Sequence, residues 1–348
     1  MNLFYASFIP GLQDFIAKVI KERLCDVEIH KLLDGAVIFE TETSYDKLNF
    51  FCFNNIFAVI SIMEGSRTLE KHIKTLCSSV DSVTDIKPIV NNSKSFRTFR
   101  IVISNENKPA AIDEKLRMEA EKTISRLSGL KVNRALPDTE FWFLYRRENE
   151  QGFSIFMKRL TLRPSWEKTL HKGELPPPLT WTLCRLANLV HTDTVLDPFC
   201  GYGSIPEAAF KYFHITKFMA CDTDRKAALF SANRFKKRKS GEFTLHVRDF
   251  CELPSLVAEK SISAIITDPP WGQFRPAETD TMFTDSAFHK KMFEIFGRLL
   301  RNGGRAVVLY ANDSLFLNAV PACFELEKSI PILLSGKKAV IYVFILKN

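Results

Sequence analysis

The second half of the chain alternates short apolar runs with longer amphipathic segments, and this alternation limits the fold more than any other feature. The strand candidates are residues 194–196, 217–221, 244–247, 264–267, 306–310 and 340–346. The helix candidates between them are residues 204–212, 224–237, 286–301 and 313–320. Buried apolar strands that alternate with helices form a doubly wound parallel sheet. We therefore predict an α/β fold for this half of the chain.

The end of the chain departs from a purely parallel sheet. Strand candidates over 324–326 and 340–346 are joined through Ser335-Gly336. A parallel pair needs a crossover of a dozen or more residues, usually a helix, and none fits there. We therefore predict that one of the closing strands is antiparallel.

The first half, to about Thr161, indicates two smaller α+β units. For the first unit we predict strands over 3–8, 27–33 and 36–40 and helices over 12–24 and 45–57. This β-α-β-β-α order is typical of a ferredoxin-like domain. For the second unit we predict strands over 96–104, 141–145 and 153–160 and a helix over 113–127, closed by Gly129.

A proline-rich stretch separates the two halves. The run Lys172-Gly173-Glu174-Leu175-Pro176-Pro177-Pro178 indicates a linker, because successive prolines favour an extended chain. We therefore divide the chain into a ferredoxin-like domain (1–65), a second α+β domain (66–165), a linker (166–180) and the α/β domain (181–348).

Composition and charge narrow the class of protein. The 348 residues are 46% hydrophobic and 25% charged, which excludes a disordered chain. The net charge of +8 is a modest argument for a polyanionic partner. Basic residues gather in the second α+β unit: Arg97, Arg100, Lys131, Arg134, Arg146, Arg147, Lys158, Arg159 and Arg163. These residues could contact nucleic acid, or they could lie on strand faces exposed to solvent. We interpret a second basic run, over 234–239 in the α/β half, mainly as the solvated end of a helix.

Cysteine spacing and hydropathy predict where the protein works. The eight cysteines are scattered and form no C-x-x-C pair, which is typical of reduced thiols in a cytoplasmic protein. Neither cysteines nor histidines have the spacing of zinc ligands, so we expect no metal. No apolar run reaches about 18 residues and the N-terminus does not resemble a signal peptide, so we expect no membrane partner.

A glycine-rich turn after the first strand of the α/β half is the clearest candidate for a ligand site. The run Asp197-Pro198-Phe199-Cys200-Gly201-Tyr202-Gly203 links an apolar strand to a helix. Gly201 and Gly203 let a ligand approach the backbone where a Cβ would clash. Asp197 would repel a phosphate, so a ligand with a cationic amino group, such as S-adenosylmethionine, fits better than a dinucleotide.

Acidic residues follow the next two strands. Asp222 comes where doubly wound folds place an acceptor for ribose hydroxyls. Asp249 follows the third strand, where a carboxylate can accept a hydrogen bond from an adenine amino group. Each carboxylate alone could be a helix cap. Three acids at the carboxyl ends of three successive strands instead predict a nucleoside-type cofactor, because ligands bind at that edge.

The fourth strand runs into Asp268-Pro269-Pro270-Trp271-Gly272. The prolines fix the backbone, so the Asp268 carboxylate and the Pro269 carbonyl can accept both hydrogens of one exocyclic amino group. Such an amine is a poor nucleophile until its lone pair turns out of the base plane. Trp271 offers a face for stacking the base. The alternative, a rigid turn without chemistry, is less consistent with the neighbouring acids.

These motifs together resemble the THUMP-domain RNA guanine-N2 methyltransferases. The resemblance rests on Asp197–Gly203 and Asp268–Gly272, with Gly173-Glu174-Leu175 as the lead-in to the catalytic fold. Residues 66–165 are similar to a THUMP domain through Val132–Asp138, and this similarity rests mainly on the order of the elements and on Leu136-Pro137-Asp138. Two residues depart from the family pattern: Tyr202 stands where a small residue is usual, and Trp271 replaces the commoner tyrosine.

The resemblance implies a class I methyltransferase fold with S-adenosylmethionine as cofactor. It implies catalytic roles for Asp268, Pro269 and Trp271, and cofactor contacts for Asp197, Phe199, Gly201, Gly203, Asp222 and Asp249. The implied product is N2-methylguanosine in structured RNA, first of all in the acceptor stem of tRNA.

Other interpretations stay open at this point. The guanosine could lie in ribosomal or another structured RNA, or the base could be adenine, methylated at N6. A third hypothesis is an RNA-binding protein with a degenerate methyltransferase fold. The sequence does not show whether a small activating protein is needed.

Overall fold

The computed structural model describes residues 1–48, 50–65, 68–78, 86, 89–90, 96–148, 151–161, 170–171, 173–236, 241–271, 286–311 and 314–347. The chain divides into two compact units. One contains Met1–Phe8 and Gln13–Pro164, and the other contains Ile9–Leu12 and Ser165–Asn348. Among the described residues, no helix is both long and apolar enough to cross a membrane.

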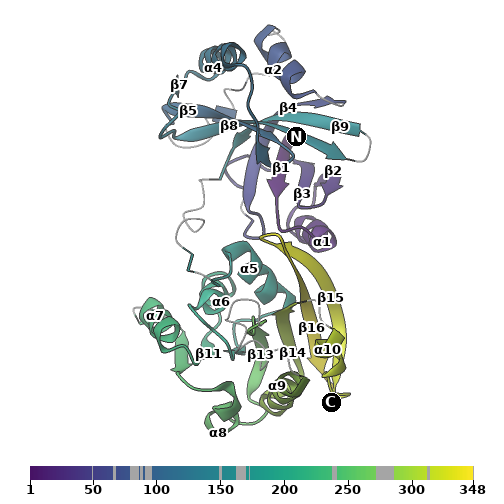
Figure 1. The fold of residues 1–348 in the computed structure, drawn as a ribbon, viewed down its shortest axis with the longest axis vertical. Helices are drawn as coiled ribbons and strands as arrows, with labels where there is room; N and C mark the ends of the chain where they lie inside the picture. Colours follow the sequence, from purple (N-terminus) through teal and green to yellow (C-terminus); the bar gives the residue numbers. More distant parts are fainter. Residues whose placement is uncertain are drawn as a thin grey trace. The chain divides into compact units, whose positions relative to one another are not determined.

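Within its described part, the N-terminal unit contains one sheet of nine strands (Figure 1). The strands are β1 (Asn2–Ser7), β2 (Glu28–Leu33), β3 (Ala36–Thr41), β4 (Asn55–Glu64), β5 (Thr98–Asn105), β6 (Lys108–Pro109), β7 (Lys131–Val132), β8 (Thr139–Glu148) and β9 (Gln151–Arg159). Their order is β2-β3-β1-β4-β9-β8-β5-β6, and β7 pairs with β5. The helices are α1 (Gln13–Arg23), α2 (Leu69–Ser78) and α4 (Glu114–Ser128).

The helix α4 shows how local sequence signals fix an element. Asp113 caps its first turn by accepting hydrogen bonds from the N–H groups of Lys115 and Leu116. Gly129 ends it in the left-handed conformation, as predicted. Helices α2 and α4 lie side by side on the sheet (Figure 1), and their buried aliphatic residues pack in one core with Phe99 and Phe143.

The helix predicted over 45–57 is wrong. Residues 45–47 form a turn, and β4 begins at Asn55. The helical spacing of Leu48, Cys52 and Ile56 is a coincidence, since the following run of aromatic and β-branched residues favours a strand. The observed order in this region is therefore β-α-β-β-β. Because β4 pairs with both β1 and β9, a single sheet runs through residues 1–65 and 66–165, and the division there remains a prediction.

The C-terminal unit has the predicted doubly wound sheet. Its strands are β10 (Thr194–Asp197), β11 (Lys217–Cys221), β12 (Glu242–His246), β13 (Ile262–Thr267), β14 (Leu300–Tyr310), β15 (Phe324–Leu334) and β16 (Lys337–Leu346). Its helices are α5 (Pro177–Leu186), α6 (Ser204–Phe213), α7 (Arg225–Phe235), the 3-10 turn η2 (Phe250–Glu252), α8 (Leu253–Leu256), α9 (Ser286–Leu299) and α10 (Ser314–Asn318).

The strand order β12-β11-β10-β13-β14-β16-β15 sets the place of the site. The first five strands are parallel, and β16 pairs antiparallel with both β14 and β15, as predicted. The chain moves outward from β10 to β12 and then returns to β13 on the other side of β10. Ligands bind at such a reversal, beyond the carboxyl ends of the strands.

The prolines expected to form an extended linker instead begin a helix. Pro176 caps α5, and Pro177 and Pro178 occupy its first turn. A proline fits there because the N–H groups of a first turn have no partner within the helix. The extended conformation predicted for residues 177–180 is therefore wrong.

Candidate active site

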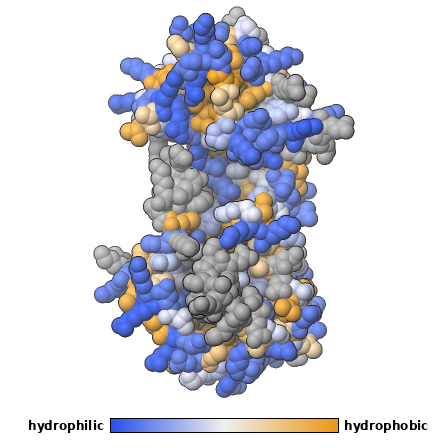
Figure 2. Space-filling model, viewed as in Figure 1, coloured by the Kyte–Doolittle hydropathy of each residue, from blue (hydrophilic) through white to orange (hydrophobic). Residues whose placement is uncertain are grey.

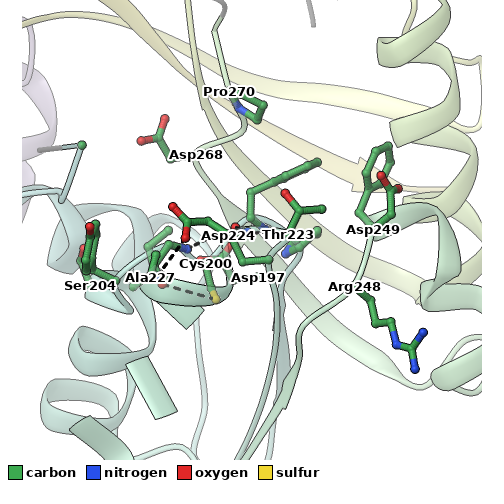
Figure 3. Close-up of a pocket in the computed structure, with 18 of the residues that line it drawn as sticks. Asp197, Cys200, Ser204, Thr223, Asp224, Ala227, Arg248, Asp249, Asp268 and Pro270 are labelled. Atoms are coloured by element: carbon green, nitrogen blue, oxygen red, sulfur yellow. Dashed lines mark hydrogen bonds between the residues drawn. The ribbon is translucent and has the colours of Figure 1, made fainter. Parts of the chain in front are cut away.

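A pocket of about 560 Å³ opens at the carboxyl ends of β10 and β13 (Figure 3). Six of the nine predicted site residues line it: Asp197, Phe199, Gly201, Asp222, Asp249 and Asp268. Pro270 lines it in place of the predicted Pro269, and Gly203 and Trp271 lie outside its lining. In the view of Figure 3, Asp268 lies next to Pro270, and Asp249 lies to the right of both.

The two glycines of the turn are needed for different reasons. Both have positive φ, +48° at Gly201 and +85° at Gly203. A Cβ on Gly203 would lie 2.5 Å from Oγ of Ser231, so this position is filled by the packing of α7. Apart from its two chain neighbours, no atom of the described residues lies within 4 Å of a Cβ placed on Gly201, although Gly201 lines the pocket. The space beside Gly201 is therefore open to a ligand.

Asp197 joins the two strands that flank the reversal. Its Oδ1 accepts hydrogen bonds from the backbone N–H of Phe199 at 3.1 Å and from the hydroxyl of Thr267 at 2.8 Å. Burial raises the pKa of the Asp197 carboxyl to about 7, while these two hydrogen bonds lower it and the charge of Asp222 adds to the rise. Asp197 thus fixes the floor of the pocket.

Asp222 organises the glycine turn from the neighbouring strand. Its Oδ2 accepts the N–H of Gly201 at 2.7 Å, and its Oδ1 accepts the N–H of Asp224 at 2.8 Å. Asp249 is exposed and caps η2 by accepting the N–H of Cys251 at 2.8 Å. The contacts predicted between these carboxylates and a ribose or adenine remain predictions.

Asp268 lies in an unusual electrostatic environment. Its Oδ1 is shielded from solvent and has no hydrogen-bond partner among the described residues. Burial raises the pKa of the Asp268 carboxyl to about 8; the neighbouring Trp271 side chain opposes this rise, and the charge of Asp197 adds to it. Buried acceptors are almost always hydrogen-bonded, so an unpaired one in a pocket indicates a place for a donor from a ligand.

Sequence reasoning missed an aromatic cluster in the same pocket. The rings of Phe199 and Phe250 lie 5.0 Å apart, and Phe288 from α9 lies 5.5 Å from Phe250. All three rings line the pocket. Helical spacing does not reveal that Phe288 reaches this site, because its neighbour Phe250 is 38 positions away along the chain.

These residues fit an S-adenosyl cofactor. The aromatic cluster offers apolar faces for a purine, and the carboxylates offer acceptors for hydroxyl and amino groups. The open space at Gly201 lets a ligand approach the backbone closely.

Comparison with known proteins agrees with this geometry. Residues 164–329 match the family model described as RMKL-like, methyltransferase domain. An *Archaeoglobus fulgidus* protein named tRNA (guanine(6)-N2)-methyltransferase is 24% identical over 91% of this chain and 85% of its own length. A *Methanocaldococcus jannaschii* protein named tRNA (guanine(10)-N2)-dimethyltransferase is 29% identical over 53% of this chain and 55% of its own length.

Solved structures share the fold. The crystal structure of TrmN from *Thermus thermophilus* has a TM-score of 0.77 at 20% identity and covers 99% of this chain and 100% of its own. The crystal structure of SMU.472 complexed with SAH has a TM-score of 0.68 at 14% identity and covers 100% of this chain and 98% of its own. The C-terminal unit therefore has the class I methyltransferase fold. Residues 164–329, a little less than half of the 348-residue chain, are therefore similar to the RMKL-like methyltransferase domain, and S-adenosylmethionine is the cofactor that this match indicates.

The basic residues expected to contact nucleic acid are mostly engaged inside the N-terminal unit. Those with internal side-chain contacts are Arg100, Arg134, Arg146, Lys158 and Arg159. Arg100 and Arg159, for example, both pair with the buried Glu140. Arg163 lies outside the described residues. Hydrophilic residues predominate on the described surface seen in Figure 2. The exposure of a basic residue is therefore not enough to identify it as a nucleic-acid contact.

Four members of the set are exposed, namely Arg97, Lys131, Arg134 and Arg147, and of these Arg134 pairs with Glu114 and Glu121. Within the described residues, the side chains of Arg97, Lys131 and Arg147 form no hydrogen bond or ion pair, and the charge of Arg97 helps to lower the pKa of Asp138. These three residues are the part of the predicted basic surface that stays available to a phosphate backbone.

The absence of a metal stays a prediction. Among the described residues, ligand atoms of Glu28, His30 and Glu40 lie within 4.8 Å of one another. Glu28 and His30 are exposed, and such groups are common without an ion.

The raised pKa values predict how stability depends on pH. Asp268 and Asp197 stay protonated in the folded protein at pH values where the unfolded chain, with pKa near 3.8, releases both protons. The free energy of unfolding therefore falls as pH rises from about 4 towards 8. The asparagine side chain of Asp268→Asn does not ionise, so this variant escapes part of the loss of stability with rising pH. The difference in melting temperature between Asp268→Asn and the wild type should therefore grow in favour of the variant, by several degrees between about pH 5 and pH 8. Thermal unfolding without cofactor measures this difference; a constant difference would refute the assignment of the raised pKa.

Proposed function

We propose that this protein transfers a methyl group from S-adenosylmethionine to the exocyclic N2 of a guanosine in tRNA, in the acceptor stem. The observation that carries the proposal is that the shielded Oδ1 of Asp268, in a pocket of the methyltransferase fold, has no hydrogen-bond partner in the described part of the chain. An amino group on a nucleobase is a donor that this acceptor lacks. The names of the relatives support tRNA and guanine N2, because two of them act on guanines in tRNA.

Three residues after β13 have roles in the proposed methyl transfer. When bound, S-adenosylmethionine supplies an electrophilic methyl group. Asp268 accepts a hydrogen of the amino group, so that the nitrogen lone pair can turn towards the methyl donor. Pro269 and Pro270 hold the backbone after β13 rigid, which keeps the carboxylate in place. The proton can leave the nitrogen after transfer, so Asp268 need not be a strong base.

The N-terminal unit would hold the RNA. Arg97, Lys131 and Arg147 would contact phosphates and position the RNA without reading its sequence. A guanosine in a stem pairs through its amino group, so it must leave the helix at a cost of a few kcal/mol, which backbone contacts offset. We place the reaction in the cytoplasm, a compartment that suits eight free cysteines.

Transcribed tRNAs test the substrate and the position. Each acceptor-stem G–C pair is replaced in turn by A–U, and methyl incorporation is measured with the purified protein. One replacement should abolish incorporation and the others should preserve it. Incorporation that survives every acceptor-stem replacement would refute the acceptor-stem position, and incorporation only into ribosomal RNA or into adenine would refute the proposed substrate.

A further inference from the structure

The segment before α5 forms one wall of the cofactor pocket. Gly173, Glu174 and Leu175 line the pocket directly beside the glycine turn. We infer that Glu174 is a positioning residue that holds this wall against α7 through Arg234 and thereby sets the affinity for the cofactor. The inference rests on the proposed methyltransferase function.

The carboxylate of Glu174 is buried and uses both oxygens. The side chain is 3% exposed. Its Oε1 accepts a hydrogen bond from Nη2 of Arg234 at 2.8 Å, and its Oε2 accepts the backbone N–H of His171 at 3.1 Å. The N–H of Glu174 in turn donates to the carbonyl of His171 at 3.0 Å. Glu174 therefore closes the segment into a turn and ties it to α7.

Arg234 connects this segment with two helices. It pairs with Glu207 of α6 at 2.9 Å, and its guanidinium lies over the ring of Phe230, 5.3 Å from the centroid. Burying an ion pair gives little net stability, because desolvation offsets the attraction. Such a pair does fix one geometry, and removing one partner leaves a charge unpaired. We therefore assign the Glu174–Arg234 pair to positioning rather than to stability.

The segment also supports the residue between the two glycines. The imidazole of His171 stacks on Tyr202, with ring centroids 4.2 Å apart and an angle of 7° between the planes. Phe230 packs edge-on against both rings. Tyr202 itself lines the pocket. The bulky residue at this position is thus held against the lead-in segment, and Glu174 fixes the turn that carries His171.

A further contact extends the network to α6. The N–H of Leu175 donates to Oγ of Ser204 at 3.3 Å, and both residues line the pocket. If Glu174 loses its partner, the wall formed by residues 173–175 and the Tyr202 ring are free to shift together. Small displacements of a binding wall reduce affinity strongly, because a preorganised site becomes one that must be ordered on binding.

Calorimetric titration with S-adenosylhomocysteine tests the inference without RNA. Glu174→Ala should weaken binding about tenfold, and Glu174→Gln, which keeps the shape and one of the two accepting oxygens, should weaken it less. The matched control is Glu207→Ala, which removes the other partner of the same guanidinium. Glu207 is 47% exposed and does not line the cofactor pocket, so its loss should change the affinity by less than about twofold.

Two further readouts separate positioning from a general loss of structure. Glu174→Gln should raise the KM for S-adenosylmethionine and leave kcat at saturating cofactor, and the KM for RNA, as in the wild type. Its melting temperature should stay close to that of the wild type, and it carries the test if Glu174→Ala does not fold. The inference would be overturned if Glu174→Ala and Glu207→Ala changed the cofactor affinity equally. It would also be overturned if neither Glu174→Gln nor Glu174→Ala changed that affinity. A wild-type protein that binds no S-adenosylhomocysteine would instead refute the proposed function.

Discussion

The Asp268→Ala protein is expected to bind S-adenosylhomocysteine as the wild type does and to transfer methyl groups about 10³-fold more slowly. The reason is that Oδ1 of Asp268 is shielded and unpaired among the described residues, so its hydrogen bond forms only with a ligand. The cofactor contacts predicted for Asp197, Asp222 and Gly201 do not depend on it. Single-turnover methylation of tRNA, together with calorimetry, measures the two quantities separately.

Asp268→Asn is the matched control for this prediction. Its amide oxygen can still accept one hydrogen bond, so it should retain more activity than Asp268→Ala. The wild-type rate should rise with pH towards about 8, where Asp268 ionises, and the rate of Asp268→Asn should lack this rise. Equal rates for wild type and Asp268→Ala would exclude Asp268 from the reaction.

The second large effect is expected at Gly201. Gly201→Ala should fold, with a loss of about 1 kcal/mol because an L-residue must adopt a positive φ. Its affinity for S-adenosylhomocysteine should fall about 100-fold, since the new Cβ projects into a space that the described residues beyond its chain neighbours leave open. Thermal unfolding and calorimetry on the same sample test both statements.

Gly203→Ala provides the contrast. There the Cβ would lie 2.5 Å from Oγ of Ser231, so the main loss should be stability, about 1–3 kcal/mol. Ser231→Ala in the same chain should restore part of that loss. If Gly201→Ala is instead the unstable protein and binds cofactor normally, the open space beside Gly201 is not part of the cofactor site.

The sequence predicts the C-terminal fold and much of its pocket for a physical reason. Each strand there is a short apolar run, and the acidic residues of the site follow directly at the ends of these strands. Asp197, Asp222 and Asp268 can therefore be located from local pattern alone, because parallel strands bring their carboxyl ends to one edge. The prediction extends to the antiparallel end of the sheet, since a short connection excludes a crossover.

The parts that sequence reasoning missed depend on contacts between distant residues. The spacing over 45–57 suits a helix locally, but pairing with β1 and β9 makes β4 a strand. Arg100 and Arg159 look free in the sequence, and only the register of β5, β8 and β9 brings them to Glu140. The basic run over 234–239 predicts a solvated helix end, yet Arg234 pairs with Glu174, 60 residues earlier.

The most direct test of the central claim is methyl transfer from labelled S-adenosylmethionine to total small RNA, with wild type beside Asp268→Ala and nucleoside analysis of the product. The structure and the comparisons predict labelled N2-methylguanosine from the wild type and none above background from the variant. Labelled N6-methyladenosine, or the same labelled N2-methylguanosine from both proteins, would contradict the account.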